Sequence, residues 1–155
     1  MTQRIEFSKT EPAAYQSMMG LEQYLAQSGL NTTLKHLIKL RASQINGCAF
    51  CLEMHTQEAR ADGENEQRLD ALNAWQETLC FTPEERAALA LTEAVTQIHK
   101  QGVPAAIYDQ ASQYFSPTAL TQILMAIITI NAWNRIAITT QMVPGSHQVA
   151  ETAFS

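Results

Sequence analysis

Basic residues are scarce in this sequence. Lys and Arg together number 10 against 15 Asp and Glu, which gives a formal net charge of −5 at pH 7. The basic residues are also scattered, with no run among them. A surface that binds nucleic-acid phosphates needs concentrated Lys and Arg, so this composition argues against a nucleic-acid partner.

A long apolar segment is missing as well. The longest apolar run, Ile123 to Ile130, is far shorter than the roughly 20 residues that cross a bilayer. The segment Met1 to Thr10 lacks the apolar core of a secretory signal. We therefore expect a cytoplasmic protein with no membrane partner.

Cysteine is rare, at three residues in 155. An odd and small number speaks against a disulfide scaffold, and structural disulfides are unusual in the cytoplasm. A Cys-x-x-Cys pair in such a protein is more often catalytic or metal-binding. The chain has one such pair, Cys48 and Cys51, with His55 four residues after the second cysteine.

These three residues fall on one face of a helix, because their spacing is i, i+3 and i+7. The Cα atoms at i and i+3 are about 5 Å apart, inside the range that a disulfide requires. Asn46-Gly47 is a turn signal, so we expect Cys48 to open the helix. Free backbone N–H groups and the helix dipole stabilise a thiolate there, and His55 can exchange a proton. The motif therefore predicts redox chemistry on sulfur.

Helical signals run through the rest of the chain. The first ten residues are expected to form an extended arm. Caps, prolines and glycines separate the expected helices. The first runs from 12 to a stop at 28–29 and the second from 31 or 32 to a break at 44–47. They are followed by 48–61, by one or two helices over 66–78, and by 83 to near 102, 104–115 and 118–140. Apolar residues occupy nearly every side of the last helix, which predicts burial all round, at the centre of the domain or in a subunit interface. We expect an all-α fold, a compact helical bundle in a single domain over residues 1–155 with a core at about 10–145.

Three stretches carry a resemblance to a known family. They are LRASQINGCAFCLEMH at 40–55, FTPEERAALALTEAVT at 81–96 and INAWNR at 130–135. The first resembles the core of the AhpD-like alkylhydroperoxidases, in the carboxymuconolactone decarboxylase superfamily, and the similarity covers roughly residues 10 to 145. The resemblance implies an AhpD-like helical bundle that oligomerises through helices into trimers or hexamers.

The resemblance also implies an activity. Decarboxylase members of the superfamily typically lack the cysteine pair, so this chain falls on the peroxidase side. The implied enzyme is a thiol-dependent alkylhydroperoxidase that reduces small organic hydroperoxides or hydrogen peroxide and forms a Cys48–Cys51 disulfide. An external dithiol, thioredoxin-like or lipoyl, would recycle the pair, with no metal and no bound organic cofactor.

The roles of the two thiols can be assigned in two ways. In the similar family the second cysteine of the motif attacks the peroxide, which makes Cys51 peroxidatic and Cys48 resolving. The helix N-terminus favours the opposite assignment, because Cys48 lies nearer the positive end of the dipole. We follow the family, since His55 is one turn from Cys51 and is suited to proton transfer.

Two positions depart from the family pattern. Enzymes of this type carry a proton-relay glutamate twelve residues before the first cysteine, where this chain has His36, and often a histidine where it has Phe50. An imidazole titrates near neutrality, so His36 is a possible relay. Glu93 is another candidate, whereas Glu53 would point away from the cysteine face.

Other interpretations of these residues stay open. Zinc could be held by both cysteines and His55, with Cys80 or His36 as the fourth ligand. The pair could also be a thiol redox switch with poor turnover. Cys80 is otherwise expected to be a buried structural thiol. Tyr15, Met18 and Met19 could line a peroxide pocket, although such a stripe usually belongs to the core.

Overall fold

The computed structural model describes residues 1–146. Helices account for all regular structure in this part of the chain, which has no strand. In chain order they are α1 (Phe7–Thr10), α2 (Pro12–Gln27), α3 (Thr32–Asn46), α4 (Ala49–Ala61), α5 (Glu66–Ala71), the 3-10 helix η1 (Leu72–Glu77), α6 (Pro83–Thr96), α7 (Ile98–Gln101), α8 (Ala105–Tyr114) and α9 (Pro117–Thr140). The predicted all-α class is confirmed.

Side-chain caps set several helix boundaries that the sequence predicts. Asn31 caps α3 by accepting a hydrogen bond from the Leu34 N–H, and Ser116 caps α9 in the same way. Thr82 and Glu85 form a reciprocal capping box at the start of α6. The prediction for the first decade is wrong in part, because residues 7–10 close one helical turn through bonds to the Glu6 and Phe7 carbonyls.

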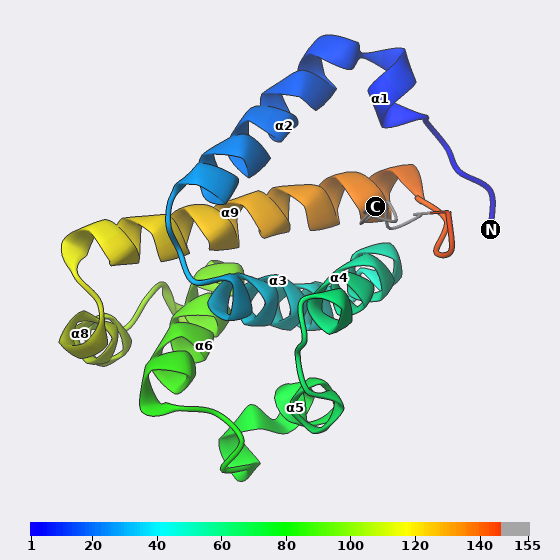
Figure 1. Cartoon of the computed structure of the whole chain (residues 1–155). Helices are drawn as coiled ribbons and strands as arrows, with labels where there is room; N and C mark the ends of the chain where they lie inside the picture. Colours follow the sequence, from blue (N-terminus) through cyan, green and yellow to red (C-terminus); the bar gives the residue numbers. More distant parts are fainter. Residues whose placement is uncertain (147–155) are drawn as a thin grey trace, which may run out of the picture.

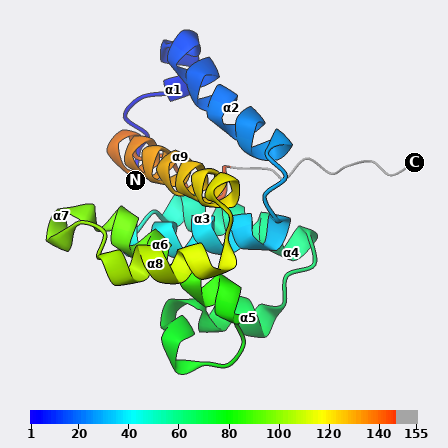
Figure 2. The ribbon, with the colours of Figure 1, turned by 90° about the vertical axis from the view of Figure 1, so that its left-hand side faces the viewer.

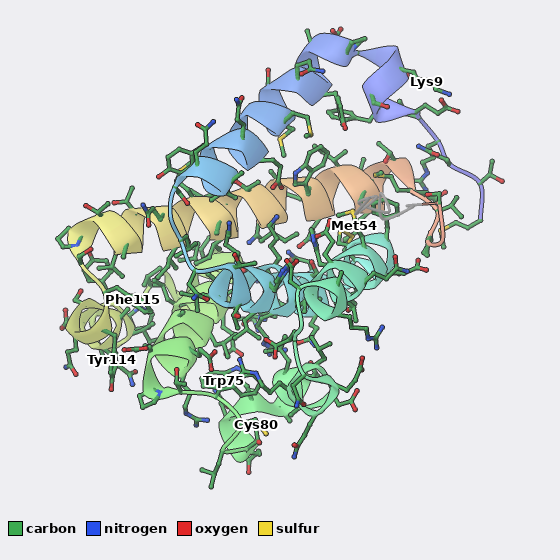
Figure 3. All side chains as sticks on the ribbon, viewed as in Figure 1. Lys9, Met54, Trp75, Cys80, Tyr114 and Phe115 are labelled. Atoms are coloured by element: carbon green, nitrogen blue, oxygen red, sulfur yellow. A yellow bond between two sulfur atoms is a disulfide. The ribbon has the colours of Figure 1, made fainter. Side chains whose placement is uncertain are left out.

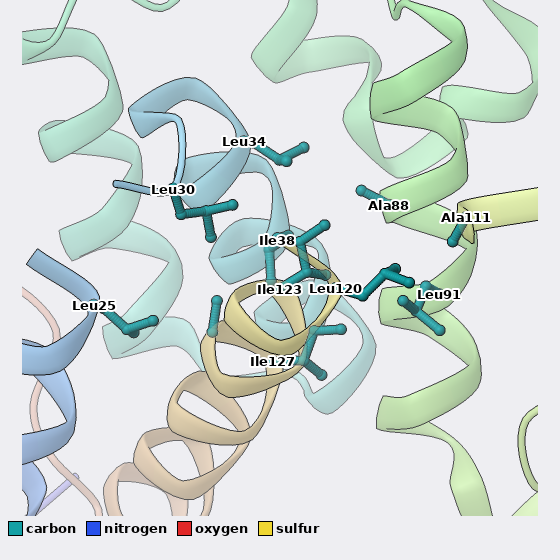
Figure 4. Packing of buried hydrophobic residues seen from close by; sticks show 11 residues of the cluster. Leu25, Leu30, Leu34, Ile38, Ala88, Leu91, Ala111, Leu120, Ile123 and Ile127 are labelled. Carbon is teal, nitrogen blue, oxygen red and sulfur yellow. The ribbon is translucent and has the colours of Figure 1, made fainter. Parts of the chain in front are cut away.

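Helix α9 is the centre of the molecule. Figures 1 and 2 show it lying between α2 on one side and α3 with α6 on the other. In Figure 4, Ile123 and Ile127 of α9 point toward Ile38 of α3, and Leu91 of α6 closes the same cluster. These four side chains are at most 4% exposed. Burial of apolar surface here holds α9 against its neighbours.

Within a single chain the outer side of α9 is only partly covered, and its burial in a subunit interface stays a prediction. Leu124, Ile128 and Ile138 are 41%, 43% and 46% exposed, so the helix is buried on part of its surface rather than all round. By length and composition alone α9 would suffice to cross a membrane. It packs as the core helix of a bundle, and such helices pass the same test in soluble proteins.

The junction between α3 and α4 positions the cysteines. Gly47 ends α3 in the left-handed region, at φ 70°, which glycine adopts without strain. The Asn46 side chain before it donates to Asn131 and Asn134 of α9, at 3.0 and 2.9 Å. Asn134 is fully buried and donates in turn to Ser43. This amide cluster fixes the start of α4 against α9.

The N-terminal segment is tied to the far end of α9. The Arg4 backbone N–H donates to the Thr140 carbonyl at 2.8 Å, and its guanidinium donates to the Thr139 carbonyl at 3.2 Å. Carbonyls in the last turn of a helix have no intrahelical partner, and Arg4 satisfies two of them. Figure 1 shows the chain start beside this end of α9.

Candidate active site

Cys48 and Cys51 form a disulfide at the start of α4, with their Cα atoms 5.3 Å apart. Cys48 is the N-cap residue, and its sulfur accepts the Cys51 backbone N–H at 3.3 Å. Both residues are 1% exposed. The predicted pairing of the sulfurs and the predicted helix start at Cys48 are both present.

One stripe of α4 lines a cavity of about 360 Å³, which we call the Cys51 cavity. The stripe consists of Cys51, Met54, His55 and Glu58, at i, i+3, i+4 and i+7. Figure 3 shows Met54 where α4 faces α9. The remaining lining residues come from α2, α3, α4, α9 and the segment after α9: Tyr15, Met19, Glu22, Lys39, Phe50, Trp133, Ala137 and Met142.

His55 is held in one tautomer. Its Nδ1 lies 2.8 Å from Glu58 Oε2, and a carboxylate can only accept, so Nδ1 donates. Burial lowers the pKa of His55 below 6.5; the Lys39 charge also lowers it, while the Glu58 hydrogen bond opposes the shift. The imidazole is therefore neutral near pH 7. Its Nε2 is an acceptor that is buried and has no hydrogen-bond partner within residues 1–146.

A second polar group faces His55 across the cavity. Glu22 of α2 accepts from Lys39 Nζ at 3.1 Å and from Trp133 Nε1 at 3.0 Å. The Tyr15 ring meets the Trp133 ring edge to face, with centroids 6.1 Å apart. These contacts fix an aromatic wall opposite the α4 stripe, so the cavity combines apolar surface with one polar end.

His36 does not lie with the cysteines. Its Nε2 is 2.6 Å from Asp62 Oδ2, at the C-cap of α4. Asp62 follows Cys51 by 62 − 51 = 11 residues, which is about 16 Å along a helix. His36 therefore lies too far from the cysteines to pass a proton to them directly.

Glu93 lies away from the cysteines too. Its Oε1 accepts from Arg41 Nε at 2.8 Å and from Trp75 Nε1 at 2.7 Å, and the residue does not line the Cys51 cavity. Glu53 points away, as expected, and accepts the Gly145 N–H at 2.5 Å. The carboxylate beside the imidazole is instead Glu58, which we did not predict although its i+3 spacing from His55 was visible.

The arrangement offers no zinc site in the described part of the chain. No group of three or more His, Cys, Asp or Glu side chains there could hold a metal ion. Cys80 is a free, half-buried thiol that accepts from the Thr78 hydroxyl at 3.0 Å. It packs with Trp75 and Phe81 in another cluster, so it cannot complete a ligand set with Cys48 and Cys51.

Relatives share both sequence and fold with this chain. The uncharacterized protein YdfG of Bacillus subtilis is 43% identical over 138 residues, which cover 89% of this chain and 94% of YdfG. A protein of unknown function from Agrobacterium tumefaciens, described as a candidate antioxidant defence protein AhpD, superposes with a TM-score of 0.91 at 41% identity. The match covers 94% of this chain and all of that one.

A more distant structure has the same fold. The AhpD core of an uncharacterized peroxidase-related protein from Ralstonia eutropha matches with a TM-score of 0.79 at 19% identity, over 90% of this chain and 75% of its own. The sequence model of the carboxymuconolactone decarboxylase family matches residues 12–94. The chain therefore belongs to the carboxymuconolactone decarboxylase family, on its AhpD-like side.

Proposed function

We propose that this protein is a Cys-x-x-Cys peroxidase that reduces small organic hydroperoxides. The observation that carries the proposal is the α4 stripe, in which a disulfide-forming Cys51 and a neutral, Glu58-anchored His55 line one cavity. Resemblance to AhpD-like proteins with antioxidant and peroxidase-related descriptions supports it.

The cycle starts from the reduced pair. His55 Nε2 accepts the Cys51 thiol proton, and the thiolate attacks the terminal oxygen of the hydroperoxide. The O–O bond breaks, Cys51 becomes a sulfenic acid, and the alkoxide leaves as alcohol with the proton from His55. The Cys48 thiol then displaces the hydroxyl from Cys51 as water and forms the disulfide. One hydroperoxide and two thiols thus give one alcohol, one water and one disulfide.

One backbone feature and one side-chain contact favour this cycle. Cys51 is the third residue of α4, where unpaired N–H groups and the dipole stabilise a thiolate. Glu58 holds the imidazole so that Nε2 is the basic atom, as in other carboxylate–histidine pairs. Here the carboxylate comes from α4 itself and takes the place of the family glutamate that His36 replaces.

The cavity walls indicate the substrate class. Tyr15, Phe50 and Trp133, with three methionines, offer apolar contact to an alkyl or aryl body. Hydrogen peroxide has no such body and gains nothing from these walls. We therefore propose that organic hydroperoxides react faster than hydrogen peroxide.

The reductant, the cofactor requirement, the location and the oligomeric state are proposed from the resemblance to AhpD-like proteins. The enzyme would use an external dithiol, hold no resident metal or organic cofactor, and act in the cytoplasm. The exposed apolar residues Leu124 and Ile128 on α9 support self-association through helices, as trimers or hexamers.

A coupled assay tests the activity. Purified protein with dihydrolipoamide should consume cumene hydroperoxide with multiple turnovers, and Cys80→Ser should keep full activity because Cys80 lies in another cluster. Cys51→Ser should abolish turnover. A sulfenic-acid trap should label Cys51 in the Cys48→Ser variant, and labelling of Cys48 in Cys51→Ser would reverse the assigned roles.

The second candidate is a thiol switch without efficient turnover. The departures at His36 and Phe50 motivate it, whereas the His55–Glu58 pair argues for catalysis. Stopped-flow oxidation separates the two. Consumption of one equivalent of hydroperoxide, with no recycling by any dithiol, would identify a switch.

A further inference from the structure

A second cavity lies at the other sulfur of the disulfide. It has a volume of about 230 Å³ and is lined by Cys48 but not by Cys51; we call it the Cys48 cavity. The Cys51 cavity is lined by Cys51 but not by Cys48. Phe50, Ala137 and Met142 line both and form the wall between them. The two ends of one S–S bond therefore border different cavities.

The Cys48 cavity differs from its neighbour in chemistry. None of its side chains is charged; they belong to Met1, Gly47, Cys48, Ala49, Phe50, Ala137, Ile138, Gln141, Met142 and Pro144. The Cys51 cavity carries the carboxylates of Glu22 and Glu58 and the ammonium group of Lys39, which lies 3.1 Å from Glu22. Lys39 offsets one of the two carboxylates, so the lining keeps a negative balance that repels an approaching thiolate, whereas the side chains beside Cys48 carry no charge.

Access to Cys48 suits a slender molecule. The cysteine is 1% exposed, but its neighbours Gly47 and Ala49 are both exposed. A Cβ at Gly47 would meet no atom within 4 Å, so the approach over this residue is open. An alkyl chain can pass such an opening and contact the apolar walls, whereas a folded protein surface cannot reach a sulfur so deeply buried.

We propose that a small alkyl dithiol enters the Cys48 cavity and reduces the disulfide by attack on Cys48. This rests on the proposed function only in that the cycle needs a reductant. Attack on a disulfide sulfur comes from the side opposite the leaving sulfur, so access to the attacked sulfur decides which one reacts. For Cys48 that access is the Cys48 cavity, and the leaving sulfur is Cys51.

The exchange balances in two steps. A donor thiolate bonds to Cys48 Sγ, the Cys48–Cys51 bond breaks, and Cys51 leaves with the electron pair as a thiolate at the helix N-terminus. The second donor thiol, once deprotonated, attacks the donor sulfur bound to Cys48, and Cys48 leaves as a thiolate. The dithiol becomes a cyclic disulfide, and two electrons and two protons pass to the protein. Reductant and hydroperoxide thus use separate cavities.

Bulky substitutions in each cavity test the route. Disulfide reduction is followed on the oxidised full-length protein with dihydrolipoamide and no peroxide. Ile138 lines only the Cys48 cavity and is 46% exposed, so Ile138→Trp should fold and should slow reduction at least tenfold. Ala49→Leu, at the first position of α4, is an independent block of the same cavity. Met54→Trp fills the Cys51 cavity and should slow reduction less than twofold.

Leu79→Trp is the control, because Leu79 is fully exposed and lines neither cavity. Its reduction rate should equal that of the parent protein. Equal slowing by Met54→Trp and Ile138→Trp, or slowing by Met54→Trp alone, would overturn the route through Cys48. So would faster reduction by a thioredoxin-type protein that Ile138→Trp and Ala49→Leu leave unchanged. The assay contains no peroxide and measures disulfide reduction alone. Its outcome therefore tests the route through Cys48 even if the protein proves to have no peroxidase activity.

Discussion

The half-buried charged cluster around Arg68 and the one around His55 differ in how the nitrogen atoms at their centres are paired. Around Arg68, on α5, every guanidinium nitrogen has a partner: Nε meets Glu64 at 2.8 Å, while Nη1 and Nη2 meet Glu85 at 3.1 and 2.7 Å. Around His55, Nδ1 is bonded to Glu58 but Nε2 has no partner within the described residues.

The difference separates a structural role from a chemical one. The paired guanidinium of Arg68 ties segments together, here α5 to the capping box of α6, and it also lies over the Phe81 ring at 4.9 Å. Among the described residues, three buried side-chain atoms have no hydrogen-bond partner, namely His55 Nε2, His36 Nδ1 and Glu64 Oε2, and of these three residues His55 alone lines the Cys51 cavity. A buried polar atom without a partner costs stability, so each one needs an explanation, and the position of His55 beside Cys51 gives a chemical one. Variants at His55 should therefore change the reaction rate, whereas variants at Arg68 should change the free energy of unfolding.

His55→Gln should have the largest effect, and on activity. Loss of a general base reduces the rate by about 100-fold, or about 2.7 kcal/mol in barrier. The thermal midpoint at pH 7.5 should change little, because the buried ring is neutral there. The measurement is kcat/KM for cumene hydroperoxide beside a melting curve. Unchanged kcat/KM would remove His55 from the proposed mechanism.

Arg68→Met should show the opposite pattern. It leaves the Glu64 and Glu85 carboxylates without their cation, and their side chains are only 7% and 15% exposed. We expect a loss of about 2 kcal/mol in the free energy of unfolding, measured by urea titration. Disulfide formation by hydroperoxide should keep its rate. A large drop in that rate in the folded variant would break the distinction between the clusters.

Glu58→Gln should have an intermediate effect on rate. The amide can still accept from Nδ1 but no longer supplies a charge that raises the basicity of the ring, so kcat should fall about tenfold. The pKa of His55 should fall further, because the raising contribution of Glu58 is lost. An unshifted acid limb in the pH profile of Glu58→Gln would contradict this. Glu53→Gln, on the opposite side of α4, is the matched control.

The pH dependence of stability should show the smallest effect. Burial holds the pKa of His55 in the folded protein below the unfolded value of 6.5, so the unfolded chain binds this proton first as pH falls. Its contribution to stability is complete above pH 6.5 and is lost as pH drops from there toward the folded pKa. The parent protein should therefore lose more stability than His55→Gln between pH 7 and pH 5. Urea titrations at each pH measure this. An equal change in the free energy of unfolding for the parent and for His55→Gln would contradict the prediction.

Much of the fold can be predicted from local signals in the sequence. Asn31, Thr82 and Ser116 each accept the backbone N–H that their position before a helix predicts, because capping depends on neighbours in sequence. The stripe with Cys51 and His55 follows from helix periodicity alone. The first turn of helix at 7–10 was missed, because it has no side-chain cap and no buried residue to mark it.

The opposite wall of the site could not be found in the same way. Glu22 and Lys39 come from different helices, 17 residues apart, and they meet only because α2 and α3 fold toward each other. The relay role expected at His36 followed a family position, whereas the side chain lies with Asp62 at the other end of α4. Contacts of this kind depend on helix packing, which no local pattern encodes.

The attachment of Arg4 to the last carbonyls of α9 has a practical consequence. It keeps Met1 on the rim of the Cys48 cavity, so any extension of the chain at this end, such as an affinity tag or a fused domain, would begin at that entrance. A leader of this kind could screen Cys48 from thiols in the buffer and alter how fast the isolated protein becomes reduced.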